Sequence, residues 1–277
     1  MRRSATMKAV VCYSGGHSSA LVAIEAVYKY GKENVILLNH DISPEVEHED
    51  VKRFKCAVAE YLGIEITYAN YEEWEHITPL KVSIKRGGFR MTHGASHCTY
   101  YLKTEPFLKW LKENYPATFE NPCEDIVILY GFDKNEPMRI QRRSQSLGVQ
   151  GYKTEFPLAY WTRTIYDTKE IGIKKPTTYR LWKHANCQGC LKAGRQHWYC
   201  AYCLRPDIWA EAKETERLIG YSIIKGVFLE DLEQQFHEMK HSKNICPSEK
   251  GSSAIFWTNV NKVLPEQQSL MPCDCSF

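Results

Sequence analysis

Strand-like and helix-like patterns of apolar residues alternate along the first half of the chain. Short apolar runs that predict buried strands occur at residues 8–13, 34–38, 65–69 and 125–130. Segments with apolar residues at helical spacing occur at residues 19–30, 45–62, 99–114 and 135–146. Strands separated by helices need crossover connections, which produce a parallel sheet covered on both faces. We therefore predict an α/β fold with a doubly wound, mostly parallel sheet and helices on both faces.

The chain changes character near residue 150, where an aromatic, loop-like segment begins and leads to a cysteine-bearing stretch. Helical spacing returns at residues 206–219 and 229–239, whereas the tail from Ser242 is polar and is predicted to be loosely folded. We predict an α/β domain at residues 1–150. A smaller helical, cysteine-bearing extension at residues 151–277 would close the site.

The overall charge adds little to this picture. The 277 residues include 36 basic and 33 acidic side chains, and the net charge of +3 is too small to indicate nucleic-acid binding. No apolar run is long enough to span a membrane, and the N-terminal residues lack the apolar segment of a signal peptide. We therefore expect a cytoplasmic protein without a membrane partner. We also expect it to form a homo-oligomer.

Eleven cysteines are many for a chain of this length. Their odd number and the lack of a secretory signal argue against a disulfide framework and favour metal or redox chemistry. We interpret Cys12, Cys56, Cys123 and Cys246 as isolated core or incidental residues. The cysteines that group in pairs are Cys187 and Cys190, Cys200 and Cys203, and Cys273 and Cys275.

A turn rich in glycine and serine separates the first predicted strand from the first predicted helix. It contains Ser14, Gly15, Gly16, Ser18 and Ser19. Glycine lets the backbone approach an anion closely, and the N–H groups at a helix start attract negative charge. The alternative is an ordinary helix cap formed by the serines. The position directly after a strand and before a helix favours a phosphate-binding loop.

This turn resembles the PP-loop, Ser-Gly-Gly-x-Asp-Ser, of the adenine nucleotide α-hydrolase-like enzymes. The residues that match the pattern are Ser14, Gly15, Gly16 and Ser19. His17 stands at the variable position, and Ser18 replaces the usual Asp, which argues against an acidic, metal-associated role there. The resemblance implies a HUP or Rossmann-like fold in which residues 14–19 bind the phosphates of ATP or of phosphoadenylyl sulfate (PAPS), with a magnesium ion as an option.

Three further segments resemble motifs of the PAPS-reductase-like family, which includes phage-type and DNA-phosphorothioation-type members. Residues 98–106 (CTYYLKTEP) are similar to its Cys-Thr-x-x-Leu-Lys-x-x-Pro signature. Residues 131–139 (GFDKNEPMR) are similar to its Gly-x-x-x-x-Glu-x-x-Arg segment, and residues 186–194 (NCQGCLKAG) to its Asn-Cys-x-Gly-Cys element. The order and spacing of the four motifs favour membership of this family more strongly than any single motif does.

The resemblance implies roles for individual residues. Lys103 and Arg139 would stabilise negative charge on the α-phosphate or on the leaving group. Without its motif, Lys103 would be interpreted as an exposed helix lysine. The residues expected to line the nucleotide site outside the turn are Asn39, Asp41, Gly131 and Glu136. Asp41 has three interpretations: it accepts from a ribose hydroxyl, it lies near a magnesium ion, or it caps a turn.

The clustered cysteines are compatible with an iron–sulfur cluster or with zinc. By spacing alone, the pairs within residues 187–190 and 200–203 are typical of a zinc knuckle. The family resemblance implies an iron–sulfur cluster instead. Its ligands would be Cys98, Cys187, Cys190 and one of Cys200, Cys203, Cys273 and Cys275. Such a cluster would supply electrons or hold a sulfur atom for transfer.

Together these features favour an adenine-nucleotide-dependent enzyme of sulfur chemistry. In one reaction that the resemblance implies, ATP adenylates an acceptor such as nucleic acid, and sulfur then displaces AMP. In the other, a thiol reduces PAPS or adenylyl sulfate (APS) to sulfite, with Cys273 or Cys275 as the attacking thiol, although the usual C-terminal motif of the reductases is absent. Either reaction requires a sulfur or electron donor, for which we expect a partner protein. A third interpretation is a non-catalytic nucleotide- or nucleic-acid-binding module with a structural zinc site.

Overall fold

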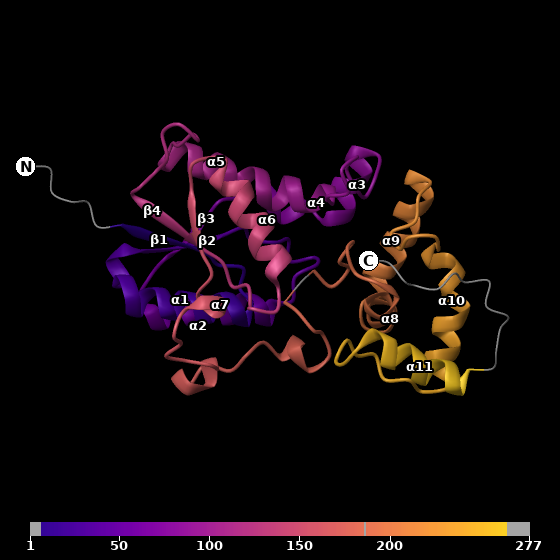
Figure 1. The fold of residues 1–277 in the computed structure, drawn as a ribbon. Coiled ribbons are helices and arrows are strands. Elements are labelled where there is room, and N and C mark those ends of the chain that lie inside the picture. The colour runs from indigo at the N-terminus through magenta and orange to yellow at the C-terminus, as the bar shows by residue number, and fades with distance from the viewer. Residues whose placement is uncertain (1–6, 186, 265–277) are drawn as a thin grey trace, which may run out of the picture. The chain divides into compact units, whose positions relative to one another are not determined.

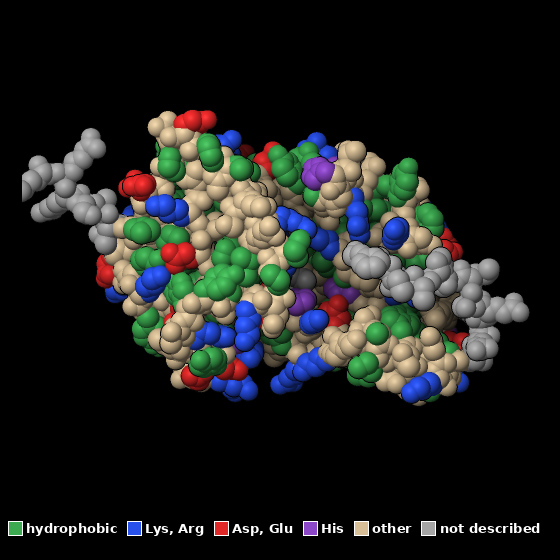
Figure 2. Space-filling model, viewed as in Figure 1, with side chains coloured by type: hydrophobic (Ala, Val, Ile, Leu, Met, Phe, Trp, Pro, Cys, Tyr) green, Lys and Arg blue, Asp and Glu red, His purple; other side chains and the backbone are tan. Residues whose placement is uncertain are grey.

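The computed structural model of the protein describes residues 7–185 and 187–264. These residues form two compact units (Figure 1). The first comprises the described residues up to Tyr179 and a short piece that contains His184 and Cys187. The second comprises Arg180–Lys183 and the described residues from Gln188 onward. Lysines, arginines and carboxylates appear on both units (Figure 2), in keeping with the small net charge.

The first unit is built on a five-stranded sheet in the order β3-β2-β1-β4-β5, in which all neighbouring strands are parallel. The strands are β1 (Lys8–Cys12), β2 (Val35–Asn39), β3 (Ile66–Tyr68), β4 (Ile126–Leu129) and β5 (Lys153–Glu155). β1 is central, and its Val10 lies opposite Ile36 on one side and Ile128 on the other. The strand order is consistent with a Rossmann or HUP-like fold, and the predicted α/β class is confirmed.

Helices cover both faces of this sheet (Figure 1). The main ones are α1 (His17–Tyr30), α2 (Glu49–Leu62), α5 (Glu105–Asn114) and α6 (Pro137–Gly148). Ala9 and Val11 of β1 pack in the same core cluster as residues of α1 and α2, whereas Val10 packs with Phe107 of α5 and Ile140 of α6. Burial on both faces explains why the central strands are continuous apolar runs rather than alternating ones.

Several elements of the first unit differ from the prediction. The helix expected from residue 45 begins at Glu49, because His48 caps it by accepting a hydrogen bond from the Asp50 N–H at 3.1 Å. The helix expected at residues 99–114 consists of α4 (His97–Thr99), a π-helical segment (Tyr100–Thr104) and α5. Pattern analysis did not predict α3 (Pro79–Arg86), the edge strand β5 or α7 (Pro157–Tyr160). Short 3-10 helices lie at Lys32–Asn34, Trp74–His76, Thr168–Ile171 and Thr177–Arg180.

The second unit is helical, with a core of aromatic side chains. It contains α8 (Arg195–Leu204), α9 (Pro206–Ile219), α10 (Leu229–His237), a π-helical segment (Glu238–Ser242) and α11 (Ser253–Val263). Trp198 and Trp209 approach with ring centroids 6.5 Å apart, and Tyr199 meets Phe236 edge-on at 5.3 Å. These large rings supply much of the apolar area that a small unit needs to bury.

The tail after Ser242 corrects one expectation. Its polar composition predicts a loose fold, but residues 253–263 form α11. Phe256 and Val260 lie one turn apart on α11. The ring centroids of Phe256 and Tyr199 are 6.1 Å apart, and Val260 is buried. Among the described residues of both units, no helix is long and apolar enough to cross a membrane.

Candidate functional site

The turn between β1 and α1 has a backbone that depends on glycine. Gly15 has a φ of +77°, a conformation that favours glycine over other residues. A Cβ at Gly15 would lie 3.3 Å from the Cδ of Lys55 and 3.3 Å from a methyl group of Val51. Gly16 follows in an ordinary extended conformation and is the N-cap of α1. The turn therefore favours glycine at residue 15 for two reasons: the backbone conformation disfavours other residues, and a side chain would press against Lys55 and Val51.

The serines of this turn divide into two kinds. Ser19 is buried, and its hydroxyl donates to the Gly16 carbonyl at 2.9 Å. Ser14 donates its hydroxyl to the Ser19 oxygen at 3.3 Å. Ser14 and Ser18 are exposed, so their hydroxyls are accessible to a ligand, whereas Ser19 stabilises the turn itself.

An oxygen atom already occupies the start of α1. The His17 N–H donates to the Tyr179 hydroxyl at 3.1 Å. The His17 ring turns away to another segment, where its Nε2 accepts from the Thr168 N–H at 3.4 Å and lies 3.7 Å from Asp167. Burial and the nearby Lys175 lower the pKa of His17. The imidazole ring of His17 is therefore engaged outside the turn, and only its backbone amide is a donor within the turn.

The end of β4 meets the same turn. β1 lies between β2 and β4, so the sheet is wound in opposite directions on its two sides, and ligands of such sheets bind at this switch point. A Cβ at Gly131 would lie 3.1 Å from the carbonyl carbon of Ser18 and 3.2 Å from its Cβ. Gly131 therefore lets the loop after β4 approach the first turn of α1 closely.

The predicted residues after Gly131 form a closed local structure. Glu136 accepts from the Asp133 N–H at 3.0 Å and forms an ion pair with Arg139. The Arg139 guanidinium lies over the Phe132 ring at 4.3 Å from its centroid, and its side chain is 62% exposed. Arg139 is thus accessible, but its charge is already paired with Glu136.

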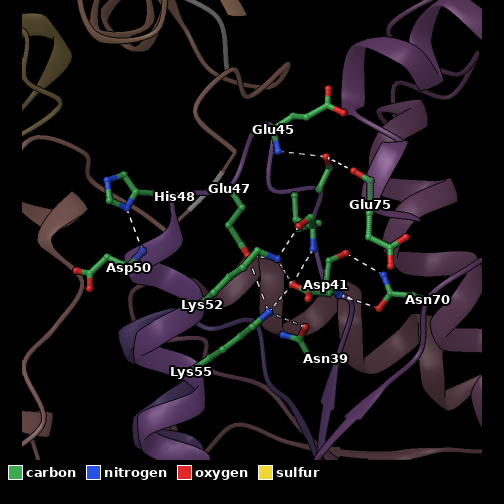
Figure 3. Close-up of polar contacts among 12 residues, drawn as sticks. Asn39, Asp41, Glu45, Glu47, His48, Asp50, Lys52, Lys55, Asn70 and Glu75 are labelled. Atoms are coloured by element: carbon green, nitrogen blue, oxygen red, sulfur yellow. Dashed lines mark hydrogen bonds and ion pairs between the residues drawn. The ribbon is translucent and has the colours of Figure 1, made fainter. Parts of the chain in front are cut away.

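The predicted residues at the end of β2 belong to a network of charges (Figure 3). Asn39 is buried and donates its amide to the Tyr13 carbonyl at 2.5 Å. One carboxylate oxygen of Asp41 accepts from Lys52 at 2.7 Å and from Lys55 at 2.5 Å. The Asp41 backbone also exchanges two hydrogen bonds with the Asn70 side chain, at 2.9 and 2.8 Å.

Glu47 completes this charge network. It lies 3.4 Å from Lys52 and 3.9 Å from Lys55, and its side chain is only 6% exposed. Burial raises the pKa of Glu47, although the two lysines partly offset the effect. Burial alone would raise the pKa of Asp41 too, but hydrogen bonds from Lys52 and Lys55 outweigh it and hold that pKa below its usual value.

Sequence reasoning missed the two lysines and Glu47. Lys52 and Lys55 lie three residues apart on α2, so they share a helix face, and lysines at this spacing are usually interpreted as solvent-exposed. Lys55 is instead 2% exposed. One feature of the sequence could have indicated them: α2 is the first helix after the second strand, so its N-terminal turns lie near the predicted phosphate loop.

Lys103 lies in the π-helical segment and is exposed. Its charge acts on His40, the residue after β2. Burial lowers the pKa of His40 to about 4, and the positive charge of Lys103 acts in the same direction. Cys98 is half-buried in α4, just before this segment. The motif at residues 98–106 thus contains a π-helical segment, a distortion that is frequent at functional sites.

The second unit holds three of the predicted ligand cysteines. The Cys190 N–H donates to Nε2 of the buried His197 at 3.0 Å. Cys200 and Cys203 lie three residues apart on α8, and burial is the main cause that raises the pKa of both thiols. Gly189 fits closely against α9, because a Cβ there would lie 2.4 Å from a methyl group of Ile208.

A metal or cluster site is not assembled by the described residues. Among residues 7–185 and 187–264, no group of three or more His, Cys, Asp or Glu side chains is arranged to hold a metal ion. Cys187 is half-buried in the first unit, and Cys273 and Cys275 lie outside the described residues. The predicted iron–sulfur ligands therefore stay a prediction.

The fold and the turn after β1 define a Rossmann or HUP-like α/β protein that is compatible with nucleotide binding. Comparison with models of known protein families and comparison with curated proteins each gave no match.

Proposed function

We propose that this chain is an adenine-nucleotide-dependent enzyme of sulfur chemistry that resembles PAPS reductase and acts at the α-phosphate or adenylyl group. The observation that carries the proposal is the turn at residues 14–19. It lies at the switch point between β1 and β4, and the His17 amide there already donates to an oxygen atom of Tyr179. Backbone amides and the positive end of a helix favour anionic oxygens, and nucleotide phosphates supply them.

The proposed roles follow from accessibility. The amides of the turn and the exposed hydroxyls of Ser14 and Ser18 would bind the phosphates. Lys103 would stabilise charge on the leaving group, because it is exposed and its charge already reaches the end of β2 at His40. Arg139 would also stabilise this charge, but only after its guanidinium leaves the ion pair with Glu136 and binds a phosphate instead.

In the proposed reaction, an acceptor oxygen attacks the α-phosphorus of ATP. The bond from that phosphorus to the bridging oxygen breaks, and pyrophosphate leaves. A sulfur nucleophile then attacks the adenylated acceptor and displaces AMP. If the cysteines hold an iron–sulfur cluster, it would supply electrons or hold the sulfur. With PAPS as the nucleotide, a thiolate would instead attack the sulfur atom and displace adenosine bisphosphate, and a second thiol would then release sulfite as a disulfide forms.

The test is binding of ATP and PAPS to the wild type and to Gly16→Val. The Gly16 backbone is extended, so valine is allowed there, but its side chain would project toward the Tyr179 hydroxyl, which lies 3.4 Å from the Cβ position. We expect binding to weaken by about tenfold or more, since the side chain would stand where phosphate oxygens bind. Gly148→Ala at the end of α6 is the control, because no atom lies within 4 Å of its Cβ position.

The products distinguish the two nucleotides. Release of AMP and pyrophosphate supports adenylation, and release of sulfite from PAPS supports reduction. Unchanged affinity of Gly16→Val for both nucleotides contradicts the phosphate-loop assignment. Release of ADP and phosphate contradicts action at the α-phosphate.

A further inference from the structure

A buried lysine lies directly behind the proposed phosphate loop. The side chain of Lys55 leaves α2 and passes under Gly15, where its Cδ is 3.3 Å from the position that a Cβ would take. The ammonium nitrogen is two bonds further along the chain, and it lies 3.4 Å from Oδ1 of Asn39. Asn39 in turn donates to the carbonyl of Tyr13, the residue before the loop. A positive charge is therefore fixed beneath the loop backbone.

Two carboxylates and a second lysine hold this charge in place (Figure 3). Asp41 accepts from Lys55 at 2.5 Å and from Lys52 at 2.7 Å, and Glu47 lies within 3.9 Å of both lysines. Lys55 is 2% exposed, so water and salt screen its charge far less than that of a surface lysine. Keeping a lysine charged at this depth requires such partners.

Asp41 and Glu136, two carboxylates at this edge of the sheet, already have partners, whereas Oε2 of the buried Glu47 has no hydrogen bond among the described residues and only the two lysines nearby. Both lysines and the Ile42 N–H donate to one oxygen of Asp41. Glu136 accepts from the Asp133 N–H and pairs with Arg139. At residue 18 a serine stands where the PP-loop pattern has an acid. A divalent ion bound through Oδ1 of Asp41 or through Glu136 would therefore compete with the lysines or with Arg139.

We infer that Lys55, held by Asp41 and Glu47 and assisted by Lys52, supplies the fixed positive charge for the nucleotide phosphates in place of a protein-bound divalent cation. Lys55 is a positioning residue, because its charge acts through the loop and does not touch the substrate. The inference rests on the proposed nucleotide-binding function. It deepens that function by stating how this site neutralises phosphate charge.

The first experiment measures the affinity of the full chain for ATP and for PAPS by calorimetry, with each nucleotide once in magnesium and once in excess EDTA. We expect the two dissociation constants of each nucleotide to agree within about threefold, because the ammonium group of Lys55 supplies the positive charge and EDTA does not remove it. Binding that weakens by about tenfold or more in EDTA overturns the inference while leaving the proposed function intact. Failure of ATP and PAPS to bind under either condition overturns the proposed function together with it.

The second experiment removes the charge while keeping the aliphatic stem that supports Gly15. In Lys55→Met we expect ATP affinity to fall by about tenfold or more and adenosine affinity to stay unchanged, because only phosphates interact strongly with the charge. Lys109→Met, on the exposed surface of α5, is the matched control and should bind both ligands like the wild type. Equal weakening for ATP and adenosine indicates a merely structural role and overturns the inference.

A charge-balanced double variant separates loss of ATP binding from loss of folding. Lys55→Met leaves the buried Glu47 and the partly buried Asp41 with one lysine, which can destabilise the unit. The double variant Lys55→Met with Glu47→Gln removes one charge of each sign. It should fold and still show the selective loss of ATP affinity. Wild-type ATP affinity in the folded double variant overturns the inference.

Discussion

Gly131 lies where the end of β4 touches the first turn of α1, and this contact leaves little room for a methyl group. The Cβ of alanine would lie 3.1 Å from the Ser18 carbonyl carbon, a backbone atom that moves only with the helix. We expect Gly131→Ala to lower the free energy of unfolding by about 1–3 kcal/mol through overpacking. Urea unfolding measures this.

Gly148→Ala is the control for this substitution. Its Cβ position meets no atom within 4 Å, and Gly148 ends α6, so alanine should be neutral or stabilising by up to about 1 kcal/mol. Equal stability of the two variants would show that the β4 loop and α1 are not in close contact.

His40 predicts how the stability of the first unit depends on pH. Its Nδ1 lies 2.7 Å from the Ala69 carbonyl, which can only accept, so the neutral ring carries its proton on Nδ1. Burial lowers the folded-state pKa of His40 from 6.5 to about 4, so between these values the unfolded chain binds more protons. Stability contributed by neutral His40 is therefore complete above pH 6.5 and is lost as the pH falls toward 4.

The corresponding measurement is urea unfolding of the wild type and His40→Asn at pH 7 and pH 5. The wild type should lose about 1–2 kcal/mol more than the variant over this interval. Asparagine can still donate to Ala69 but does not titrate, so it separates the two effects. An equal loss in both proteins would mean that His40 titrates normally in the fold.

At the residue scale, sequence reasoning located the turn but not its charged support. Gly131 is expected only from the resemblance of residues 131–139 to a family motif. Residues 14–19 are predictable, because a glycine next to a strand end marks a turn. Lys52, Lys55 and Glu47 are not, because charged residues on a helix normally face water. Their burial follows from the way α2 packs beside Gly15, and this contact between distant segments has no local pattern in the sequence.

At the scale of elements, Glu216 on α9 shows how one buried carboxylate can fix a neighbouring helix. It is 1% exposed, and it accepts from the Ile223 N–H and from the Leu229 N–H, both at 2.6 Å. Leu229 is the first residue of α10, so Glu216 satisfies an amide that has no partner within that helix. The connection between α9 and α10 therefore depends on this side chain.

Glu216→Gln should lower the stability of the second unit by about 1–3 kcal/mol, because the new NH₂ group cannot accept from a backbone N–H. Chemical unfolding followed by tryptophan fluorescence measures the loss; Trp198 and Trp209 report on this unit, and Trp74, Trp110 and Trp161 report on the first. The control is Glu214→Gln on the same helix, where an exposed pair with Arg217 at 3.6 Å should contribute less than about 1 kcal/mol. A glutamine variant at residue 216 as stable as the one at 214 would contradict the capping role.

Periodicity predicted the long elements of the first unit well, because their buried faces repeat with a regular period. It failed at the edge strand β5, which has three residues and only one neighbouring strand. It also failed at the π-helical segment Tyr100–Thr104, since such segments are rare, short and enclosed in α-helices, and five residues are too few to show a period of their own. The alternation of strands and helices predicts the class of fold, but it does not by itself give the order of the strands in the sheet.

At the scale of the whole molecule, the two compact units have separate cores. Gly131 and Glu216 lie in different units, and their contacts stay within their own unit. We expect the effects of Gly131→Ala and Glu216→Gln to add in the double variant, with a coupling below about 0.5 kcal/mol. Unfolding curves of the wild type, the two single variants and the double variant measure this coupling. A coupling above about 1 kcal/mol would show that the two sites interact energetically.

The hydroxyl of Tyr179 accepts from the His17 amide and would compete with any ligand for that donor. Under the proposed function, a phosphate oxygen would exchange with this internal acceptor, which the chain holds at a permanently high effective concentration. The measured affinity is then the intrinsic affinity divided among open and closed populations. One neutral hydrogen bond of about 0.5–1.5 kcal/mol sets that ratio at roughly two- to twelvefold. Because this cost is the same for every ligand that uses the amide, free sulfate and a nucleotide would both bind more weakly than to an open turn, and a nucleotide would offset the cost through its further contacts.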